Sequence, residues 1–330
     1  MIKTTGLTKQ FDDFTAVDNL TFNIPSGQLL ALLGPNGAGK TTTVRMLSAI
    51  LRPTSGKAFI NGHDVVQEAD LVRREIGLLT EQPGLYTRST GLEYLEFFGS
   101  LYGMSKTDSH DRSKQLFRRF GMAEYELRRL GEYSKGMRQK IGLMRAMLHH
   151  PSVLMLDEPT SAMDPHSAKL VRDAIIELKD DKRAIIVCTH NLVEAELLAD
   201  KIAIISRGRI IAQGNPEDLK RQLLGRRLFE LHLDDTVDGH LDGIGMIIDI
   251  ETIDVDSVDA RSLRYRTDDP QMMNPQLVKY LTEKGIGVVS LHEISASLEQ
   301  VYLQVVESDL SEGTQTNEGD EREPNAIPAQ

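Results

Sequence analysis

The most informative residues of this sequence form a glycine-rich run that matches a phosphate-binding pattern at every fixed position. The pattern is G-x-x-x-x-G-K-[ST], and here it is filled by Gly34, Pro35, Asn36, Gly37, Ala38, Gly39, Lys40 and Thr41. Glycines let backbone N–H groups turn toward phosphates, and the lysine supplies a full positive charge to the β- and γ-phosphates. The hydroxyl of Thr41 is suited to Mg²⁺, and Thr42 completes the loop. The run therefore predicts phosphate binding.

The segments on either side place this run at a strand-to-helix junction. Residues 29–33 are continuously apolar, which is typical of a buried strand. After the run, Val44, Leu47 and Leu51 recur at helical spacing. Because a helix N-terminus adds partial positive charge, this context favours phosphate binding over the alternative of an ordinary glycine-rich turn.

Two carboxylates follow a second apolar run, residues 153–156. Asp157 and Glu158 are expected at the carboxyl edge of a parallel sheet, the edge that binds ligands in open α/β folds. Asp157 can hold Mg²⁺ through its water shell, and Glu158 can polarise an attacking water. A solvated acidic strand end is the alternative. Together with the glycine-rich run, the pair predicts a hydrolytic site.

A second anion-binding surface is predicted at residues 133–140, which precede apolar residues at helical spacing. Ser134 is a natural N-cap, and Gly136 leaves the backbone N–H groups approachable. One ATP does not need two such helix ends from a single chain. The segment therefore requires an explanation beyond one self-contained site.

These motifs, with Ser161-Ala162-Met163-Asp164 and Thr189-His190, occur in the order and spacing of ATP-binding cassette (ABC) transporter ATPase subunits. The chain resembles that family over roughly residues 2–220. The 134–137 segment, Ser-Lys-Gly-Met, resembles the exporter-type (ABC-2-like) ATPases whose permease is a separate chain. The resemblance implies an α/β fold: a P-loop NTPase core with a RecA-like parallel sheet, an antiparallel β subdomain and an α-helical insertion.

The resemblance also implies roles around the nucleotide. Phe11 would stack on adenine and Val17 would line the ribose side, although an aromatic near the N-terminus is more often a core residue. Glu158 would act as the catalytic base. His190 resembles the switch histidine that hydrogen-bonds the γ-phosphate, whereas a histidine at a strand end is usually unremarkable.

The second anion-binding surface is explained by the resemblance to a dimeric ATPase. Ser134 and Gly136 would contact the γ-phosphate held by the other subunit, and Asp164 would bridge the two sites. The implied active state is a head-to-tail homodimer with two ATP molecules and Mg²⁺ at its interface.

Two positions depart from the usual family pattern. Glu81 stands where most members carry Gln, and Gln82 follows it. Either can ligate Mg²⁺ through oxygen, so the sequence leaves open which of them serves. Lys135 replaces a usual Gly; it either adds positive charge toward the opposing phosphate or is simply solvated.

Composition agrees with this interpretation. The 330-residue chain has one cysteine, Cys188, so it forms no internal disulfide, as expected in a reducing cytosol. No apolar stretch reaches the length of a membrane span, and the N-terminus does not resemble a signal peptide. The formal charge is −11, of which residues 307–330 contribute −6. No basic stripe indicates nucleic-acid binding.

The motifs divide the chain into three predicted parts. Residues 1–220 form the nucleotide-binding domain, with the helical insertion at about 84–150. Residues 227–306 form a small α+β domain, with strands near 229–233, 247–255, 263–267 and 288–291 and helices near 274–284 and from 298 onward. Residues 307–330 are expected to be a disordered acidic tail. By resemblance, the small domain supports dimerisation or regulation.

The predicted function is that of an ATP-hydrolysing motor that drives a separate transmembrane permease, for export. The chain is expected at the cytoplasmic face of the cell membrane, held there through the permease. By resemblance, a permease helix would enter a groove formed by the insertion and the Glu81 region, where Tyr86, Tyr94, Phe97 and Phe98 are either groove or helical core. The alternatives are a non-transport ABC ATPase that remodels nucleic acid or a protein complex, and a regulatory module without turnover.

Overall fold

The structure is a computed structural model of the 330-residue chain. It describes all residues except 162, 181, 235–260, 295–296 and 316–330, and it describes no side chains in 307–315. Ala162 and the strand expected at 247–255 therefore lie outside the described residues. The chain divides into two units, Met1–Pro216 with Val305–Gln330, and Glu217–Gln304. Each unit is described by itself below.

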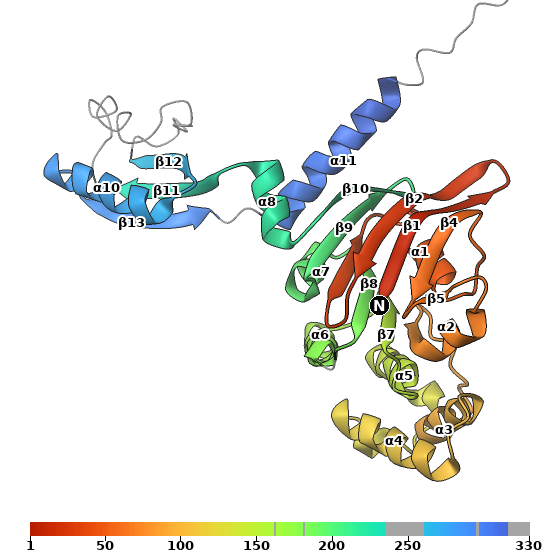
Figure 1. Ribbon diagram of the computed structural model, residues 1–330. Coiled ribbons are helices and arrows are strands. Elements are labelled where there is room, and N and C mark those ends of the chain that lie inside the picture. The colour runs from red at the N-terminus through yellow and green to blue at the C-terminus, as the bar shows by residue number, and fades with distance from the viewer. Residues whose placement is uncertain (162, 181, 235–260, 295–296, 316–330) are drawn as a thin grey trace, which may run out of the picture. The chain divides into compact units, whose positions relative to one another are not determined.

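The first unit opens with an antiparallel sheet of strand order β2-β1-β4-β5 (Figure 1). Its strands are β1 (Ile2–Phe11), β2 (Phe14–Ile24), β4 (Ser55–Ile60) and β5 (His63–Asp64). In β2, Leu20, Phe22 and Ile24 are buried and the residues between them are exposed. This period of two is typical of a strand with one covered face. The expected antiparallel subdomain is confirmed.

The core of the first unit is a sheet of strand order β10-β9-β3-β8-β7-β6. Its strands are β3 (Leu29–Leu33), β6 (Ile76–Leu79), β7 (Val153–Asp157), β8 (Ala184–Thr189), β9 (Lys201–Ser206) and β10 (Arg209–Gly214). All neighbours are parallel except β9 and β10. Every residue of β3, β7 and β8 is buried, which explains why their sequences are continuously apolar and do not alternate.

The parallel register brings three strand ends to one edge of this sheet. Leu33 at the end of β3 pairs with Thr189 at the end of β8, and Asp157 at the end of β7 pairs with Cys188. The segments that leave these strands, beginning at Gly34, Glu158 and His190, must therefore emerge side by side.

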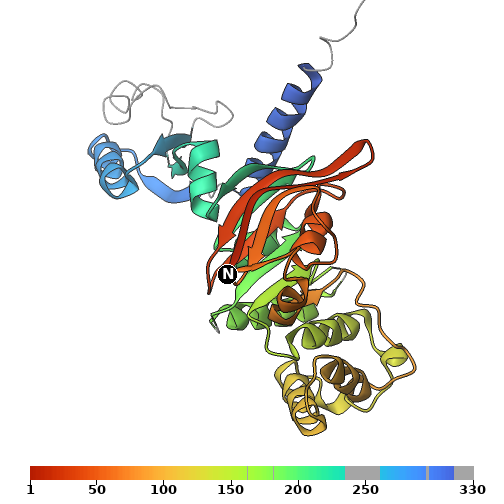
Figure 2. The same cartoon turned by 45° about the vertical axis from the view of Figure 1, so that its right-hand side comes forward.

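Helices cover the sheet and form the insertion. The helices of the core are α1 (Lys40–Leu47), α2 (Ala69–Glu75), α5 (Lys135–Met147), α6 (Pro165–Asp180) and α7 (Leu192–Leu198). The insertion contains α3 (Gly91–Leu101), α4 (Lys106–Arg119) and the 3₁₀ turns η1 (Ala123–Tyr125) and η2 (Leu130–Glu132). Figures 1 and 2 show α3 and α4 together at the end of this unit remote from the antiparallel sheet.

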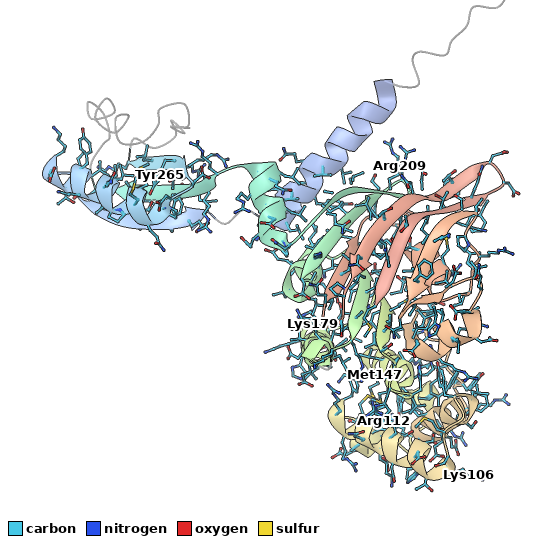
Figure 3. The ribbon with its side chains drawn as sticks, in the orientation of Figure 1. Lys106, Arg112, Met147, Lys179, Arg209 and Tyr265 are labelled. Atoms are coloured by element: carbon cyan, nitrogen blue, oxygen red, sulfur yellow. The ribbon has the colours of Figure 1, made fainter. Side chains whose placement is uncertain are left out.

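The insertion is fastened to α5 by a hydrogen bond. Arg112 of α4 donates from Nη2 to the backbone carbonyl of Met147 at 3.2 Å, near the end of α5 (Figure 3). The first helix of the insertion, α3, begins at a capping box formed by Thr90 and Glu93. Since α5 is the helix that starts after Ser134, the insertion and the second anion-binding surface share one rigid element.

The second unit contains a three-stranded antiparallel sheet and a helix that covers one of its faces. The strands β11 (Arg227–Leu233), β12 (Ser262–Thr267) and β13 (Val288–Ile294) lie in the order β12-β11-β13, and the helix is α10 (Pro270–Glu283). Phe229 and Leu231 of β11 are buried in one cluster with Leu277 and Leu281 of α10. Tyr265, labelled in Figure 3, stacks on Phe229 with ring centroids 5.6 Å apart.

The boundaries of two C-terminal helices differ from the sequence expectations. The helix α10 begins before the expected residue 274, because the Asp269 side chain caps it by accepting a hydrogen bond from the Met272 N–H at 3.1 Å. The helix α11 (Leu298–Gln315) runs into the segment expected to be disordered, so that expectation is wrong for residues 307–315. Extending an existing helix costs far less than starting one, which accounts for the extra turns.

The helix α8 (Pro216–Leu224) follows the last strand of the first unit. The division between the two units falls within α11, at Val305. Among the described residues, no helix combines the length and the apolar character that crossing a bilayer requires.

Candidate active site

The loop between β3 and α1 is shaped by glycines that no other residue can replace. Gly39 lies immediately before α1 with φ of 102°, in the left-handed region, and a Cβ there would stand 2.5 Å from the carbonyl oxygen of Ala16. A Cβ at Gly34 would stand 2.3 Å from the carbonyl oxygen of Ile205. The loop therefore lies tightly against β2 and β9, and the start of α1 is fixed in place.

Lys40 is drawn into the curve of this loop. It is the first residue of α1 and only 6% exposed. Its ammonium group donates to the backbone carbonyls of Gly34 at 2.6 Å and Pro35 at 3.0 Å. The full charge of Lys40 and the N-terminal N–H groups of α1 thus converge on the space that the loop encloses, which is the geometry of a phosphate site.

Thr41 and Asp157 are brought together from residues far apart in the sequence. The Thr41 hydroxyl donates to Oδ2 of Asp157 at 2.9 Å. Burial raises the pKa of Asp157, the hydrogen bond from Thr41 opposes this rise, and the charges of Glu158 and Glu81 add to it. Hydroxyl and carboxylate oxygens are the ligands that Mg²⁺ prefers, so this donor set fits that ion.

Glu158 and His190 form the reactive pair at this edge of the sheet. Oε1 of Glu158 lies 2.8 Å from Nδ1 of His190, and the Glu158 side chain is 11% exposed. The backbone of Glu158 has φ of 51°, which is uncommon for a residue with a side chain, and its N–H donates to the Cys188 carbonyl at 2.9 Å. Such backbone conformations concentrate at active sites because the surrounding structure must hold them.

A network behind this pair contains residues that the sequence analysis did not single out. Glu194 of α7 is 1% exposed and accepts hydrogen bonds from the hydroxyls of Thr160 and Thr189, each at 2.7 Å. Burial raises the pKa of Glu194, and the two threonine hydrogen bonds oppose this rise. The network joins the segment after β7 to the end of β8. It therefore fixes the separation of Glu158 and His190.

The signal for Glu194 is present in the sequence but weak. Asn191 caps α7 by accepting from the Glu194 N–H at 3.1 Å, and Glu194 occupies the third helical position. A glutamate there ordinarily indicates only a capped helix start. Its burial between two threonines depends on the packing of α7 against the sheet.

Phe11 and Val17, the residues expected beside the adenine and the ribose, differ in their exposure to solvent. Phe11 is 42% exposed at the end of β1, with the Lys9 ammonium 4.8 Å from its ring centre, so it is available for stacking. Val17 is fully buried against Gly39, so it supports the loop from behind, and its role in lining the ribose stays a prediction. Phe14, which pairs with Phe11 across the hairpin, is a second exposed aromatic that the sequence analysis missed.

The second anion-binding surface is assembled from α5 and α6. Ser134 caps α5 by accepting from the Met137 N–H at 3.3 Å. A Cβ at Gly136 would lie 3.3 Å from Oγ of Ser167, whose N–H donates to Asp164 at 3.0 Å. That hydrogen bond lowers the pKa of Asp164. The structure therefore brings Ser134, Gly136 and Asp164 to one surface, with Ser134 and Asp164 exposed.

Aromatic side chains gather where the insertion meets the segment after Glu81. Tyr86 is 52% exposed and Phe97 is 44% exposed, with ring centres 5.7 Å apart, whereas Tyr94 is fully buried and Phe98 is half-buried. Arg145 of α5 donates to the Pro83 carbonyl at 2.6 Å and to the Tyr94 hydroxyl at 2.9 Å. Of the four aromatics, Tyr86 and Phe97 are therefore exposed and available to a groove, whereas Tyr94 and Phe98 pack toward the helical core.

Comparisons with known proteins agree with this geometry. The ABC transporter family matches residues 17–161. The daunorubicin/doxorubicin resistance ATP-binding protein DrrA of Streptomyces peucetius is 37% identical over 305 residues, which cover 92% of this chain and 91% of that protein.

Among solved structures, the ATP-binding subunit of an ABC transporter superposes with a TM-score of 0.63 at 29% identity, covering 68% of this chain and 94% of that one. The dimeric ATP-binding cassette MJ0796, bound to ADP and Pi, superposes with a TM-score of 0.61 at 23% identity, covering 65% of this chain and 98% of that one, and this likeness shows the fold. The chain belongs to the ABC transporter ATP-binding proteins, and it is the ATP-hydrolysing motor subunit of a transporter.

Proposed function

We propose that this chain hydrolyses ATP with Glu158 as the base, in a head-to-tail homodimer that drives export through a separate permease. The observation that carries the proposal is the pairing of Glu158 with His190 at 2.8 Å, on the same sheet edge as the Thr41–Asp157 hydrogen bond. A base, an orienting partner and a phosphate loop are thereby within one site.

The donor set supports Mg²⁺ as the accompanying ion. Thr41, Asp157 and Glu81 would hold it, directly or through water, with Glu81 serving in place of the neighbouring Gln82. The ion supplies charge neutralisation on the phosphates when it is bound. Glu81 stands where most members of the family carry Gln, and its carboxylate offers an oxygen ligand of the kind that Mg²⁺ prefers.

The residues of this chain divide the hydrolytic work. Lys40 and the N–H groups at the start of α1 hold the β- and γ-phosphates. Glu158 accepts the proton of the attacking water at a carboxylate oxygen. His190 donates from Nδ1 to a carboxylate oxygen of Glu158, which fixes the orientation of that carboxylate. Phe11 stacks on the adenine base.

The dimer follows from the placement of the second anion-binding surface. Ser134 and Gly136 lie at the start of α5 and Asp164 at the start of α6, so each copy offers one helix end to the nucleotide of the other. The cassette MJ0796 is a dimer in its solved structure, which supports this arrangement. ATP would close the two copies, and hydrolysis would reopen them.

The permease is proposed to dock at the exposed aromatics of the insertion, Tyr86 and Phe97. The relative DrrA carries the name of a drug-resistance ATP-binding protein, which supports export as the direction. Docking would hold this chain at the cytoplasmic face of the membrane.

The test is permease-dependent ATP hydrolysis. The chain is purified from detergent-solubilised membranes together with its membrane subunit, and turnover is compared before and after the two are separated. We expect the complex to be faster, and we expect Tyr86→Ala with Phe97→Ala to lose this stimulation while the separated chain keeps its basal rate.

Ile50→Ala is the matched control, since Ile50 is an exposed apolar residue (62%) outside the insertion. Equal turnover with and without the membrane subunit would contradict the transport assignment. Stimulation that survives the double substitution would leave transport standing and overturn the docking site.

A further inference from the structure

We propose that the second unit carries a zinc site formed by Glu230, His232 and His292. The one ligand atom that each of these side chains offers lies within 4.8 Å of the other two. Nε2 of His232 and Nε2 of His292 each stand 3.2 Å from the same oxygen, Oε2 of Glu230. The site is outside the nucleotide-binding machinery and independent of the function proposed above.

The strand register explains why these three side chains meet. Glu230 and His232 are two residues apart on β11, so they point to the same face of the sheet. His292 of β13 pairs directly with Glu230 across the strands. Because β11 is the central strand, the cluster lies in the middle of the sheet. The other face is occupied by Phe229, Leu231 and the helix α10.

The distances are compatible with a metal ion as well as with an ion pair. With bonds of about 2.0–2.1 Å, two ligands of a tetrahedral zinc ion stand roughly 3.3 Å apart. Both separations between Glu230 and a histidine already have this value, and only the two imidazoles need to approach each other. Their rings are nearly parallel, at 14°, with centres 5.7 Å apart. Two histidines and one glutamate are also a known zinc ligand set that leaves a fourth position for water.

Arg264 supplies the outer contact that ordered metal sites commonly have. Its Nε donates to Oε1 of Glu230 at 2.8 Å, which leaves Oε2 directed at the two histidines. The positive charge of Arg264 lowers the affinity for a cation relative to an isolated carboxylate. We therefore expect a dedicated site of moderate affinity.

Zinc binding would need only local adjustment of the two imidazole rings. Nε2 of each ring already lies 3.2 Å from Oε2 of Glu230. With zinc bound, both Nε2 atoms become ligands and each ring carries its proton on Nδ1. The ion would then tie β11 to β13 and stabilise the second unit by mass action.

The experiment is zinc titration of the full-length chain without an affinity tag, by calorimetry, in excess Mg²⁺ so that hard oxygen sites in the first unit are occupied. We expect one zinc ion per chain, and an affinity lowered at least about tenfold by His292→Gln and by His232→Gln. His63→Gln is the matched control, because His63 also lies 3.1 Å from a glutamate, Glu68, but belongs to no three-residue cluster in the described part of the chain. It should bind zinc as the wild type does.

A second measurement does not depend on the variants. Co²⁺ added to the wild-type chain should give the visible absorption band of a tetrahedral nitrogen and oxygen site, and Zn²⁺ should displace it. The only thiol, Cys188, is buried in the first unit and should give no sulfur-to-metal band. No zinc binding, or binding that both histidine variants leave unchanged, would overturn the proposal and leave the cluster as an ion-pair network.

Discussion

The two units of this chain both place charged side chains on β-sheets, but they do so in different ways. In the first unit the six-stranded sheet is buried, and its functional groups emerge at one edge, from the loops after β3, β7 and β8. In the second unit the sheet has one face covered by α10, and its charged groups stand on the other face. In the first unit the ends of parallel strands determine where the functional side chains lie. In the second unit the pairing register of antiparallel strands determines it.

This difference sets how tightly each site is built. At the edge of the first sheet, Lys40, Asp157 and Glu158 are each less than 10% exposed as whole residues, although the His190 side chain is 57% exposed. Hydrogen bonds hold Lys40 and Asp157, and Glu158 has a positive φ. On the face of the second sheet, His232 and His292 have about half of their side-chain surface exposed. Desolvated groups on a fixed backbone are suited to catalysis. Partly exposed side chains that strand pairing brings together are suited to binding an ion, because the ion itself completes the site.

Among the changes that should affect one unit and spare the other, the largest expected effect comes from Lys40→Ala. Removing the only full positive charge within the phosphate loop should reduce ATP hydrolysis by about a hundredfold or more, because that charge acts in a desolvated site. Turnover of the purified chain measures the loss. The second unit should be unaffected, as judged by zinc titration of the same variant. Hydrolysis at the wild-type rate would show that the loop is not the catalytic phosphate site.

Leu231→Ala should do the opposite, because it alters the core of the second unit and leaves the first unit unchanged. Leu231 is fully buried, so its truncation leaves a cavity and should destabilise this unit by about 2–5 kcal/mol. Hydrogen exchange of peptides from β11 and β13 measures the effect. ATP binding by the first unit should remain. If ATP binding were lost together with the protection of β11 amides from hydrogen exchange, the stability of the first unit would depend on that of the second.

The smallest expected effect concerns a half-buried histidine of the first unit. Burial lowers the pKa of His149 to about 4, and its ring stacks on Tyr102 with centres 3.7 Å apart. The unfolded chain takes up this proton near pH 6.5 and the folded chain only near pH 4, so the contribution of His149 to stability falls as the pH drops through that window.

The measurement is the urea midpoint of unfolding at about pH 7 and about pH 5, for wild type and His149→Phe. The variant keeps an aromatic ring against Tyr102 but cannot titrate, so its midpoint should fall less on acidification. An equal fall in both proteins would exclude His149 as a source of the pH dependence.

Much of the first unit could be predicted from sequence because its signals are local. The loop of residues 34–41 has a fixed pattern, the buried strands are continuous apolar runs, and Asp157 and Glu158 follow one of them directly. Parallel strands then bring their carboxyl ends to one edge without further information. The Ser134 cap is local in the same sense.

The remaining features depend on packing between distant segments, and sequence alone did not reveal them. The sequence predicts that Val17 lines the ribose but does not reveal that it packs against Gly39, which depends on how β2 meets the loop. Glu194 resembles an ordinary helix-start glutamate until α7 is packed against Thr160 and Thr189. Likewise, Glu230 and His292 are brought together only by the register of β11 against β13.

The most direct test of the central claim is the turnover of Glu158→Gln. The substitution keeps the shape of the side chain and removes its ability to accept a proton. ATP hydrolysis is expected to fall by about 10²- to 10⁴-fold while ATP binding remains, so that an ATP-bound dimer accumulates. Glu177→Gln, which removes an exposed carboxylate of α6, is the control and should hydrolyse ATP normally. A Glu158→Gln chain that turns over at the wild-type rate would contradict the assignment of Glu158 as the base.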